Sequence, residues 1–173
     1  MTNRELGTAI RNDLKANGYK IRDFSVRVRD SLYDTAVDIR IKNPMIRKSE
    51  VEKIVKKYEE VDRDAATGEI LAGANTYIFT QYEYGIFEEA AAELLPTAEK
   101  VLNNKEKYSG RKIAETETKT AHIIHYDGCA WTLAEFNKEE NIVREYRPTY
   151  WIRCPQDLAI AMWRFKNIGT IYC

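Results

Sequence analysis

Two neighbouring stretches of alternating apolar and polar residues constrain the fold of this chain more than any other feature. Every second residue is apolar in "DFSVRVRD" (23–30) and in "TAVDIRIKNP" (35–44), namely Phe24, Val26, Val28, Val37, Ile39 and Ile41. A period of two residues is typical of a β-strand with one buried face. Because only a short link joins the two stretches, they are predicted to pair as an antiparallel hairpin.

Helical patterns flank this hairpin. Residues 2–18 carry an apolar residue at every fourth position and end in Gly18, which predicts a helix. Ser49 and Glu52 have the spacing of a capping box, so a second helix is expected to begin there. The β-forming run "NTYIFTQYEY" (75–84) predicts a third strand. The order αββαβ predicts an α+β fold, an antiparallel sheet with its helices on one face.

The second half of the chain is predicted to begin with a helix and a linker. The stretch "IFEEAAAELL" (86–95) is strongly helical and is interrupted by Pro96. The stretch "NNKEKYSGRK" (103–112) has the composition of a linker. Beyond it, the Asp127-Gly128 turn between two β-forming stretches predicts a second hairpin.

The last part of the chain is predicted to add one strand and a closing helix. "NIVREYRPTYWIRC" (141–154) predicts the strand, and Pro155 suits the first position of the helix. We therefore expect a first domain at residues 1–104 and a β-rich extension with a C-terminal helix at 111–173. The extension forms either a small companion lobe or one continuous domain with the first part.

The charge of the chain is balanced overall but uneven along its length. Lysine plus arginine and aspartate plus glutamate number 27 each, so the net charge is zero. This balance does not support a general nucleic-acid coat protein or an acidic DNA mimic, both of which normally show a strong charge bias. Residues 1–60 carry 14 basic and 10 acidic side chains, whereas residues 61–100 carry 2 and 8. The commonest meaning of such runs is a solvated surface.

The sequence predicts a cytoplasmic protein that does not cross a membrane. No apolar run approaches the ~18 residues that a membrane helix needs, and the first residues, "MTNRELGTAI", lack the apolar core of a signal peptide. Three cysteines, Cys129, Cys154 and Cys173, are expected to be reduced thiols in that compartment.

Acidic residues and glycines cluster in "DRDAATGEILAGANTYIF" (62–79). Three carboxylates, Asp62, Asp64 and Glu69, are of the type that binds Mg²⁺ or Ca²⁺, but their spacing is not that of a calcium-binding loop. The alternative is structural: the aspartates cap turns, and the glycines shape the path from helix to strand. The structural reading is favoured, and neither a metal nor a cofactor is expected.

Histidines and cysteines raise two further alternatives. His122, His125, Cys129 and Cys154 are the residue types of a zinc site, yet two histidines three residues apart on a strand point to opposite faces. A nucleophilic Cys129 with His125 as its base is also conceivable, although no protease or transferase signature accompanies it. No catalytic residue is assigned, and an enzyme remains the less favoured class.

Aromatic and basic residues alternate near the end of the chain. "REYRPTYWIR" contributes Arg144, Tyr146, Arg147, Tyr150, Trp151 and Arg153, and "WRFK" (163–166) follows it. Such mixtures stack bases and contact phosphates in single-strand binders. They also supply the most energetic contacts of protein interfaces, and they occur in ordinary amphipathic strands. All three readings stay open.

The first half of the chain resembles a known family. The segments "IRNDLKANG", "FSVRVRD", "DIRIKNP" and "EVEKIVKKYEEVDRDAATGEILAGANTYIF" are similar to the large polyvalent protein-associated domains of phages and conjugative elements. The resemblance covers roughly residues 8–84, about half of the chain, and that family has no established catalytic residues. It implies a mobile-element protein that acts inside a bacterial host, often against host defences.

These observations lead to one expected function and one alternative. The resemblance implies a non-enzymatic phage or mobile-element protein that binds and blocks a host defence protein, in its sharpest form an anti-CRISPR inhibitor of a Cas effector. The candidate partner-binding residues are Asp62, Asp64, Glu69, Arg144, Tyr146, Arg147, Tyr150, Trp151 and Arg153. The alternative is a nucleic-acid-binding accessory protein of mobile-element DNA metabolism, which would use Arg27, Arg29, Arg40 and the C-terminal basic aromatic residues.

Overall fold

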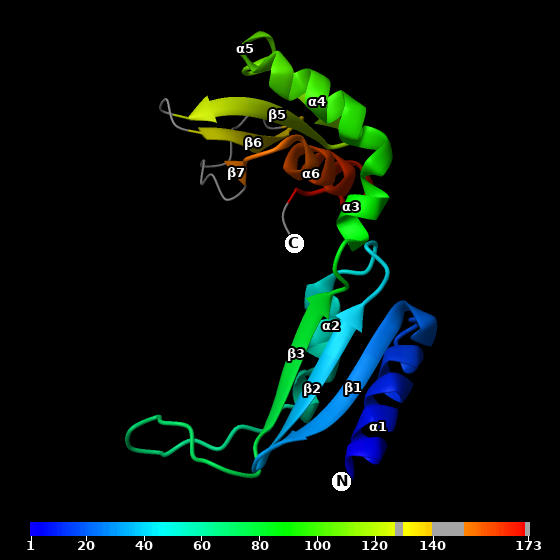
Figure 1. Cartoon of the computed structure of the whole chain (residues 1–173), viewed down its shortest axis with the longest axis vertical. Coiled ribbons are helices and arrows are strands. Elements are labelled where there is room, and N and C mark those ends of the chain that lie inside the picture. Colours follow the sequence, from blue (N-terminus) through cyan, green and yellow to red (C-terminus); the bar gives the residue numbers. More distant parts are fainter. Residues whose placement is uncertain (127–129, 140–150, 172–173) are drawn as a thin grey trace. The chain divides into compact units, whose positions relative to one another are not determined.

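The chain divides into two compact units. The computed structural model describes residues 1–126, 130–139 and 151–171, and its units are Met1–Ile86 and Phe87–Cys173 (Figure 1). The first domain was expected to extend to residue 104, but the division lies after Ile86. The reason is that helix α4 (Leu95–Asn103) packs against the last helix, α6 (Pro155–Ile168), and so belongs to the second unit.

The first helix, α1 (Asn3–Ala16), forms as the sequence predicts. Thr2 caps it: the Thr2 hydroxyl accepts a hydrogen bond from the Glu5 amide at 3.3 Å, and the Glu5 carboxylate accepts one from the Thr2 amide at 2.8 Å. This reciprocal capping box pairs amides that a helix leaves without partners at its N-terminus. Leu6, Ile10 and Leu14 are buried, so the apolar stripe faces the core.

The three strands of the first unit form one sheet in the order β1-β2-β3. Strands β1 (Phe24–Ser31) and β2 (Asp34–Ile41) pair as the predicted antiparallel hairpin. Strand β3 (Thr76–Tyr82) runs parallel to β2, so this sheet is mixed rather than wholly antiparallel. Helix α2 (Lys48–Val55) lies in the connection between β2 and β3, and a connection of that length allows a parallel pair. The αββαβ order and the α+β class are confirmed.

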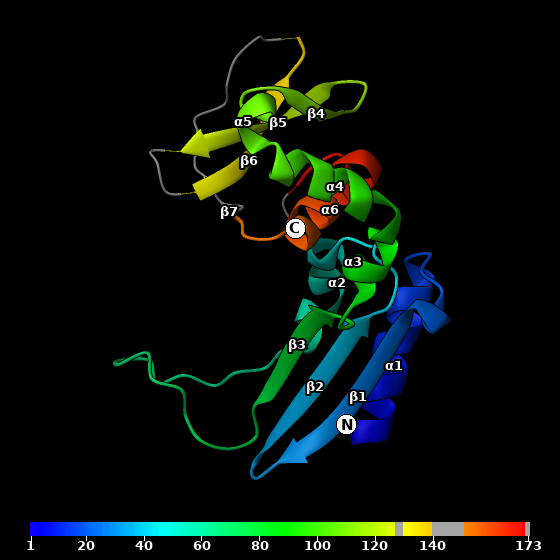
Figure 2. The same ribbon diagram turned by 45° about the horizontal axis from the view of Figure 1, so that its top comes forward.

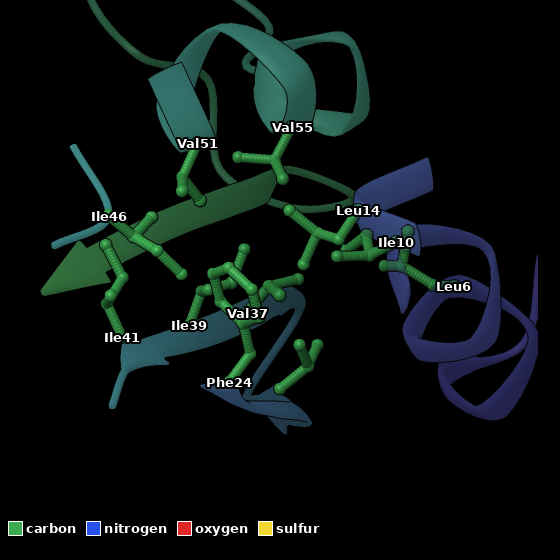
Figure 3. Packing of buried hydrophobic residues seen from close by; sticks show 11 residues of the cluster. Leu6, Ile10, Leu14, Phe24, Val37, Ile39, Ile41, Ile46, Val51 and Val55 are labelled. Atoms are coloured by element: carbon green, nitrogen blue, oxygen red, sulfur yellow. The ribbon is translucent and has the colours of Figure 1, made fainter. Parts of the chain in front are cut away.

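The core of the first unit lies between one face of this sheet and the two helices. Figure 2 shows α1 and α2 on the same side of the strands. Figure 3 shows the apolar side chains of both helices converging on those of β1 and β2. The cluster consists of Leu6, Ile10, Leu14, Phe24, Val26, Val37, Ile39, Ile41, Ile46, Val51 and Val55. Burying each of the larger side chains stabilises the fold by about 1.5–3 kcal/mol, so this face holds the unit together.

Helix α2 begins differently from the prediction. The predicted cap, Ser49, lies inside the helix, which starts at Lys48 without any side-chain cap. The Lys48 amide instead donates to the Tyr82 hydroxyl of β3 at 3.2 Å, and that hydroxyl donates to the Ile46 carbonyl at 2.9 Å. The capping-box prediction was wrong because a contact from a distant strand replaces the local cap.

A contact between a tyrosine and a carboxylate next to α2 makes the stability of the first unit fall as the pH rises in the alkaline range. The Tyr58 hydroxyl donates to Asp13 of α1, whose carboxylate also pairs with Lys57 at 2.7 Å. Burial, and then the hydrogen bond to Asp13, raise the pKa of Tyr58 from its ordinary 10.0 to about 12. The folded state therefore keeps this proton where the unfolded chain loses it.

We expect the stabilising effect of Tyr58 to be complete below pH 10 and to be lost as the pH rises through about 12. Between these values the wild type should lose stability more steeply than Tyr58→Phe. Tyrosinate absorbance should show a group that titrates near pH 12 in the wild type and is missing from the variant. Equal slopes of stability against pH in the two proteins would contradict this prediction.

The second unit contains an antiparallel sheet in the order β4-β5-β6-β7 and several helices. Its strands are β4 (Lys112–Glu115), β5 (Lys119–Tyr126), β6 (Ala130–Asn137) and β7 (Trp151–Ile152). Its first helices are α3 (Ile86–Ala90), which starts at the division, α4, and α5 (Lys105–Tyr108). The predicted linker at 103–112 therefore contains helix α5 and the start of β4.

Helix α6 closes the second unit as predicted. Pro155 is its first residue, and Gly169 follows it in the left-handed conformation with φ 80°. Ile123, Leu133, Leu158 and Phe165 are fully or almost fully buried and mark the core of this unit. Of the predicted elements, the Asp127-Gly128 turn and most of the strand at 141–154 lie outside the described residues. No helix among the described residues is both long enough and apolar enough to span a membrane.

Candidate nucleic-acid interface

The candidate site is the face of the first sheet that points away from α1 and α2. Because successive side chains of a strand point to opposite faces, the residues between the core positions share this face. Strand pairing aligns them in three rows, Arg29–Ala36–Tyr77, Arg27–Asp38–Phe79 and Ser25–Arg40–Gln81. We call these nine residues the open face. In Figure 1 the strands β2 and β3 pass in front of α2.

The open face is positively charged. Arg27, Arg29 and Arg40 are exposed, and Asp38 is the one carboxylate of the nine residues. Arg29 Nη2 lies 2.9 Å from Asp38 Oδ2, so these two charges are paired. Within the described residues, the side chains of Arg27 and Arg40 form no ion pair or hydrogen bond. Two guanidinium groups are thus available to an anionic ligand, and guanidinium matches phosphate in both charge and geometry.

Two aromatic rings lie beside these arginines. The ring centroids of Tyr77 and Phe79 are 6.4 Å apart, and the ring planes differ by 24°. Phe79 is 52% exposed although it is a large apolar residue. Rings exposed on a sheet surface stack bases in sheet-based RNA-binding modules. The arginines and the rings together give the face both components that bind a nucleic acid strand.

A groove continues the basic surface around the edge of β1 to helix α1. It has a volume of about 860 Å³. Arg4 and Arg11 of α1 line it together with the three arginines of the open face, and Asp38 is its one acidic residue. Five arginines against one carboxylate create a strongly positive groove, which attracts polyanions.

Gly7 allows α1 to approach β1 closely enough to form this groove. A Cβ atom at Gly7 would lie 3.3 Å from Val28 Cγ2 and 3.2 Å from Arg11 Nη1, closer than side chains normally pack. Arg11 Nη2 donates to the Val26 carbonyl at 2.5 Å, which holds the guanidinium against the strand. The position of Arg11 is therefore fixed by the sheet, whereas Arg4 is exposed.

The predicted acidic residues lie elsewhere, on a connection that we call the arm (residues 61–75). In Figure 1 the arm extends away from the end of the sheet. Asp64 Oδ1 accepts hydrogen bonds from the Ala66 and Thr67 amides, both at 2.8 Å. These amide bonds and the Thr67 hydroxyl lower the pKa of Asp64. The Asp64 carboxylate therefore shapes the turn at the tip, as the structural reading of this segment predicted.

Asp62 and Glu69 are exposed, and the structure does not gather the three carboxylates around one point. No group of three or more His, Cys, Asp or Glu residues in the described parts of the chain is arranged to hold a metal ion. The base of the arm is fixed by Asn75, whose Oδ1 accepts from the Asp62 amide at 2.7 Å. Asp62 thus helps to fix the base of the arm through its backbone amide.

Replacing Asp64 with alanine should loosen the tip of the arm. The lost hydrogen bonds resemble those of a helix cap and are worth about 1 kcal/mol. Thermolysin cleaves beside apolar residues, and Ile70 and Leu71 of the arm are exposed. We expect cleavage of the arm to be about fivefold faster in Asp64→Ala. Glu69→Ala, which removes an exposed carboxylate of the same arm, is the control. Equal rates in the two variants would mean that Asp64 does not hold the turn.

The zinc alternative is not supported by the contacts of His122. Its Nδ1 lies 3.1 Å from the Gly110 carbonyl, and its Nε2 lies 3.1 Å from the Thr120 hydroxyl. Both ring nitrogens are therefore occupied by other partners, and the ring packs edge-on against Phe136. Cys129, the nucleophile of the less favoured enzymatic alternative, lies outside the described residues.

The predicted C-terminal residues are only partly covered by the structure. Arg144, Tyr146, Arg147 and Tyr150 lie outside the described residues. Trp151 is 42% exposed on β7, where it pairs with Thr132 of β6. Arg153 is exposed, and its amide donates to Asp157 at the start of α6. These residues belong to the second unit, whereas Asp62, Asp64 and Glu69 belong to the first.

The sequence reading assigned three arginines of the site to the alternative function and missed the other components. The alternation in "TYIFTQ" places Tyr77, Phe79 and Gln81 on one face, so a strict two-residue period would have grouped the rings. Arg4 and Arg11 are seven residues apart, which puts them on one side of a helix. That this side borders the edge of β1 depends on packing and is not visible in the sequence.

No protein-family model, no curated protein and no solved structure matches this chain. The candidate site therefore rests on the residues and geometry of this chain alone.

Proposed function

We propose that the first unit binds nucleic acid through its open face and the adjoining groove. The observation that carries this proposal is that Arg27 and Arg40, whose side chains have no partner among the described residues, share one face of the sheet with the exposed Phe79 ring. Guanidinium groups neutralise phosphates, and aromatic rings stack on bases, so the surface offers a partner for both parts of a nucleotide. The protein acts here as a binding module and not as an enzyme.

Fluorescence anisotropy with labelled oligonucleotides over a series of salt concentrations tests this proposal. Each phosphate contact releases counterions, so the logarithm of the affinity should fall linearly with the logarithm of the salt concentration. Arg29 is paired with Asp38, which leaves Arg4, Arg11, Arg27 and Arg40 to contact phosphates. With three or four of these arginines engaged on a single strand, a slope of about −2 to −3 is expected. Failure to bind any oligonucleotide at low salt would refute the proposal.

A second candidate function is the binding and blocking of a host defence protein, as the resemblance to mobile-element domains implies. One surface of the first unit favours a protein partner. Leu32 and Tyr33 at the tip of the β1–β2 hairpin are 95% and 81% exposed, and the Ala74 amide of the arm donates to the Tyr33 carbonyl at 2.8 Å. Ile70 and Leu71 of the arm add further exposed apolar side chains. Exposed apolar groups of this kind mark interaction surfaces.

In this second candidate function the protein acts in the cytoplasm of a bacterial host and inhibits a CRISPR–Cas effector by direct contact. Pull-down of purified effectors, followed by a cleavage assay with and without this protein, is the test. Binding that survives Arg27→Glu/Arg40→Glu but not Ile70→Asp/Leu71→Asp would assign it to the arm. No binding to any effector and no change in phage plating would refute it.

A further inference from the structure

We infer that the nucleic acid bound at the open face is a single strand whose bases lie on Tyr77 and Phe79 and whose phosphates follow the arginine groove. This inference rests on the proposed function and names its ligand class. Single-stranded RNA and single-stranded DNA share this chemistry, and the experiment below distinguishes them.

The first argument is the spacing of the two rings. Their centroids are 6.4 Å apart, whereas successive bases of a duplex strand are about 3.4 Å apart. Bases that remain stacked on each other cannot each stack on one of these rings. Bases of an extended, unpaired strand can, because their faces are free and their backbone can stretch. The ring pair therefore favours a strand that is already unstacked.

The second argument is the distribution of charge around the rings. A second, smaller hollow of about 420 Å³ is lined by both rings and by Arg29. Arg29 also lines the groove between the open face and α1. Asp30 and Asp34 line this hollow as well. Their carboxylates accept hydrogen bonds from Asn3 and Asn75, so they are held in place. Carboxylates repel phosphates, so the hollow suits bases and the groove suits the backbone.

The third argument is the position of the arginines relative to the two rings. Arg40 of β2 lies one strand and Arg27 of β1 lies two strands away from β3, which carries the rings. Arg4 and Arg11 lie farther out, on α1 beyond β1. The basic residues therefore lie on the β1 side of the rings and not around them. A single nucleic acid strand that runs across the sheet from β3 toward β1 can therefore place bases on the rings of β3 and phosphates beside the arginines of β2, β1 and α1.

The test compares the full-length protein with three labelled probes of equal length, a single-stranded RNA, a single-stranded DNA and a DNA duplex. We expect at least one single strand to bind about tenfold or more tightly than the duplex. Tyr77→Ala and Phe79→Ala should each weaken single-strand binding about tenfold. Phe79→Tyr keeps a ring and should bind nearly as well as the wild type, and circular dichroism checks that the variants are folded.

Each outcome has a distinct meaning. A preference for RNA or for DNA supports the inference and identifies the source of the strand, as does equal binding of both. Single-strand binding that Phe79→Ala and Tyr77→Ala leave unchanged overturns the role of the rings, and duplex binding equal to or tighter than single-strand binding overturns the ligand class. In both of those cases nucleic-acid binding by the protein stands, whereas binding to none of the probes refutes the proposed function itself.

Discussion

Replacing Arg27 and Arg40 together with glutamate will lower the affinity for a single-stranded oligonucleotide about 100-fold or more at moderate salt. Both side chains are exposed on the open face and have no ion-pair partner among the described residues, so phosphate is their natural partner. The double substitution removes two phosphate contacts and places two repulsive charges in the groove. The salt dependence should change with it, because losing two contacts makes the slope shallower by about 1.4.

The matched control carries the same change in net charge at another place. Arg22 and Lys53 are exposed residues of the same unit that do not line the groove. Arg22→Glu/Lys53→Glu should keep most of the affinity and the salt slope. If both double variants lose affinity equally, binding depends on total charge and the groove is not the site.

Replacing Asn75 with alanine will destabilise the first unit by about 2–3 kcal/mol. Asn75 is 1% exposed, and its side chain connects three backbone or side-chain groups. Its Nδ2 donates to the Leu71 carbonyl at 2.7 Å and to Asp34 Oδ1 at 3.1 Å, and its Oδ1 accepts from the Asp62 amide at 2.7 Å. Alanine removes the bonds of the Leu71 carbonyl and the Asp62 amide at a place that water reaches poorly, and each unsatisfied group costs about 1–3 kcal/mol. Asp34 keeps the hydrogen bond from the backbone amide of residue 75.

Hydrogen exchange is the suitable measurement, because the three tryptophans all belong to the second unit and their fluorescence does not report on the first. Amides of β2 and β3 should lose protection by about 100-fold in Asn75→Ala, whereas those of β5 and β6 should be unchanged. Asp62→Ala keeps the backbone amide that Asn75 binds, so its protection should stay near that of the wild type. Unchanged protection in Asn75→Ala would show that the arm is not fastened to the sheet through this residue.

The elements that the sequence predicted well depend on local signals. Helix α1 has its cap at Thr2, its apolar stripe and its stop at Gly18 within one short segment, and all of these features can be read without knowledge of the rest of the fold. The β1–β2 hairpin is likewise determined by two alternating stretches and a short link. The face on which Arg27 and Arg40 lie follows from this alternation.

The elements that the sequence did not predict depend on distant contacts. The parallel pairing of β3 with β2 is a property of the path through α2, and the start of α2 depends on the Tyr82 hydroxyl. The boundary after Ile86 follows from the packing of α4 on α6. The candidate site depends on both kinds of information. The two-residue period of β1 and β2 predicts the face on which its arginines lie, whereas the pairing of β3 with β2 places the rings of Tyr77 and Phe79 on that face.

The contact between Arg11 and the Val26 carbonyl also affects how the protein behaves at high concentration. Strand β1 is at the edge of its sheet, and an exposed edge is a template on which a second chain can add a strand and start aggregation. Arg11 occupies one carbonyl of that edge, and Arg27, Arg29 and Asp30 place exposed charges along the strand. Natural proteins use such charges to prevent edge-to-edge association. We therefore expect the arginines that form the groove to protect the chain from self-association as well, so that a variant without them would be less soluble.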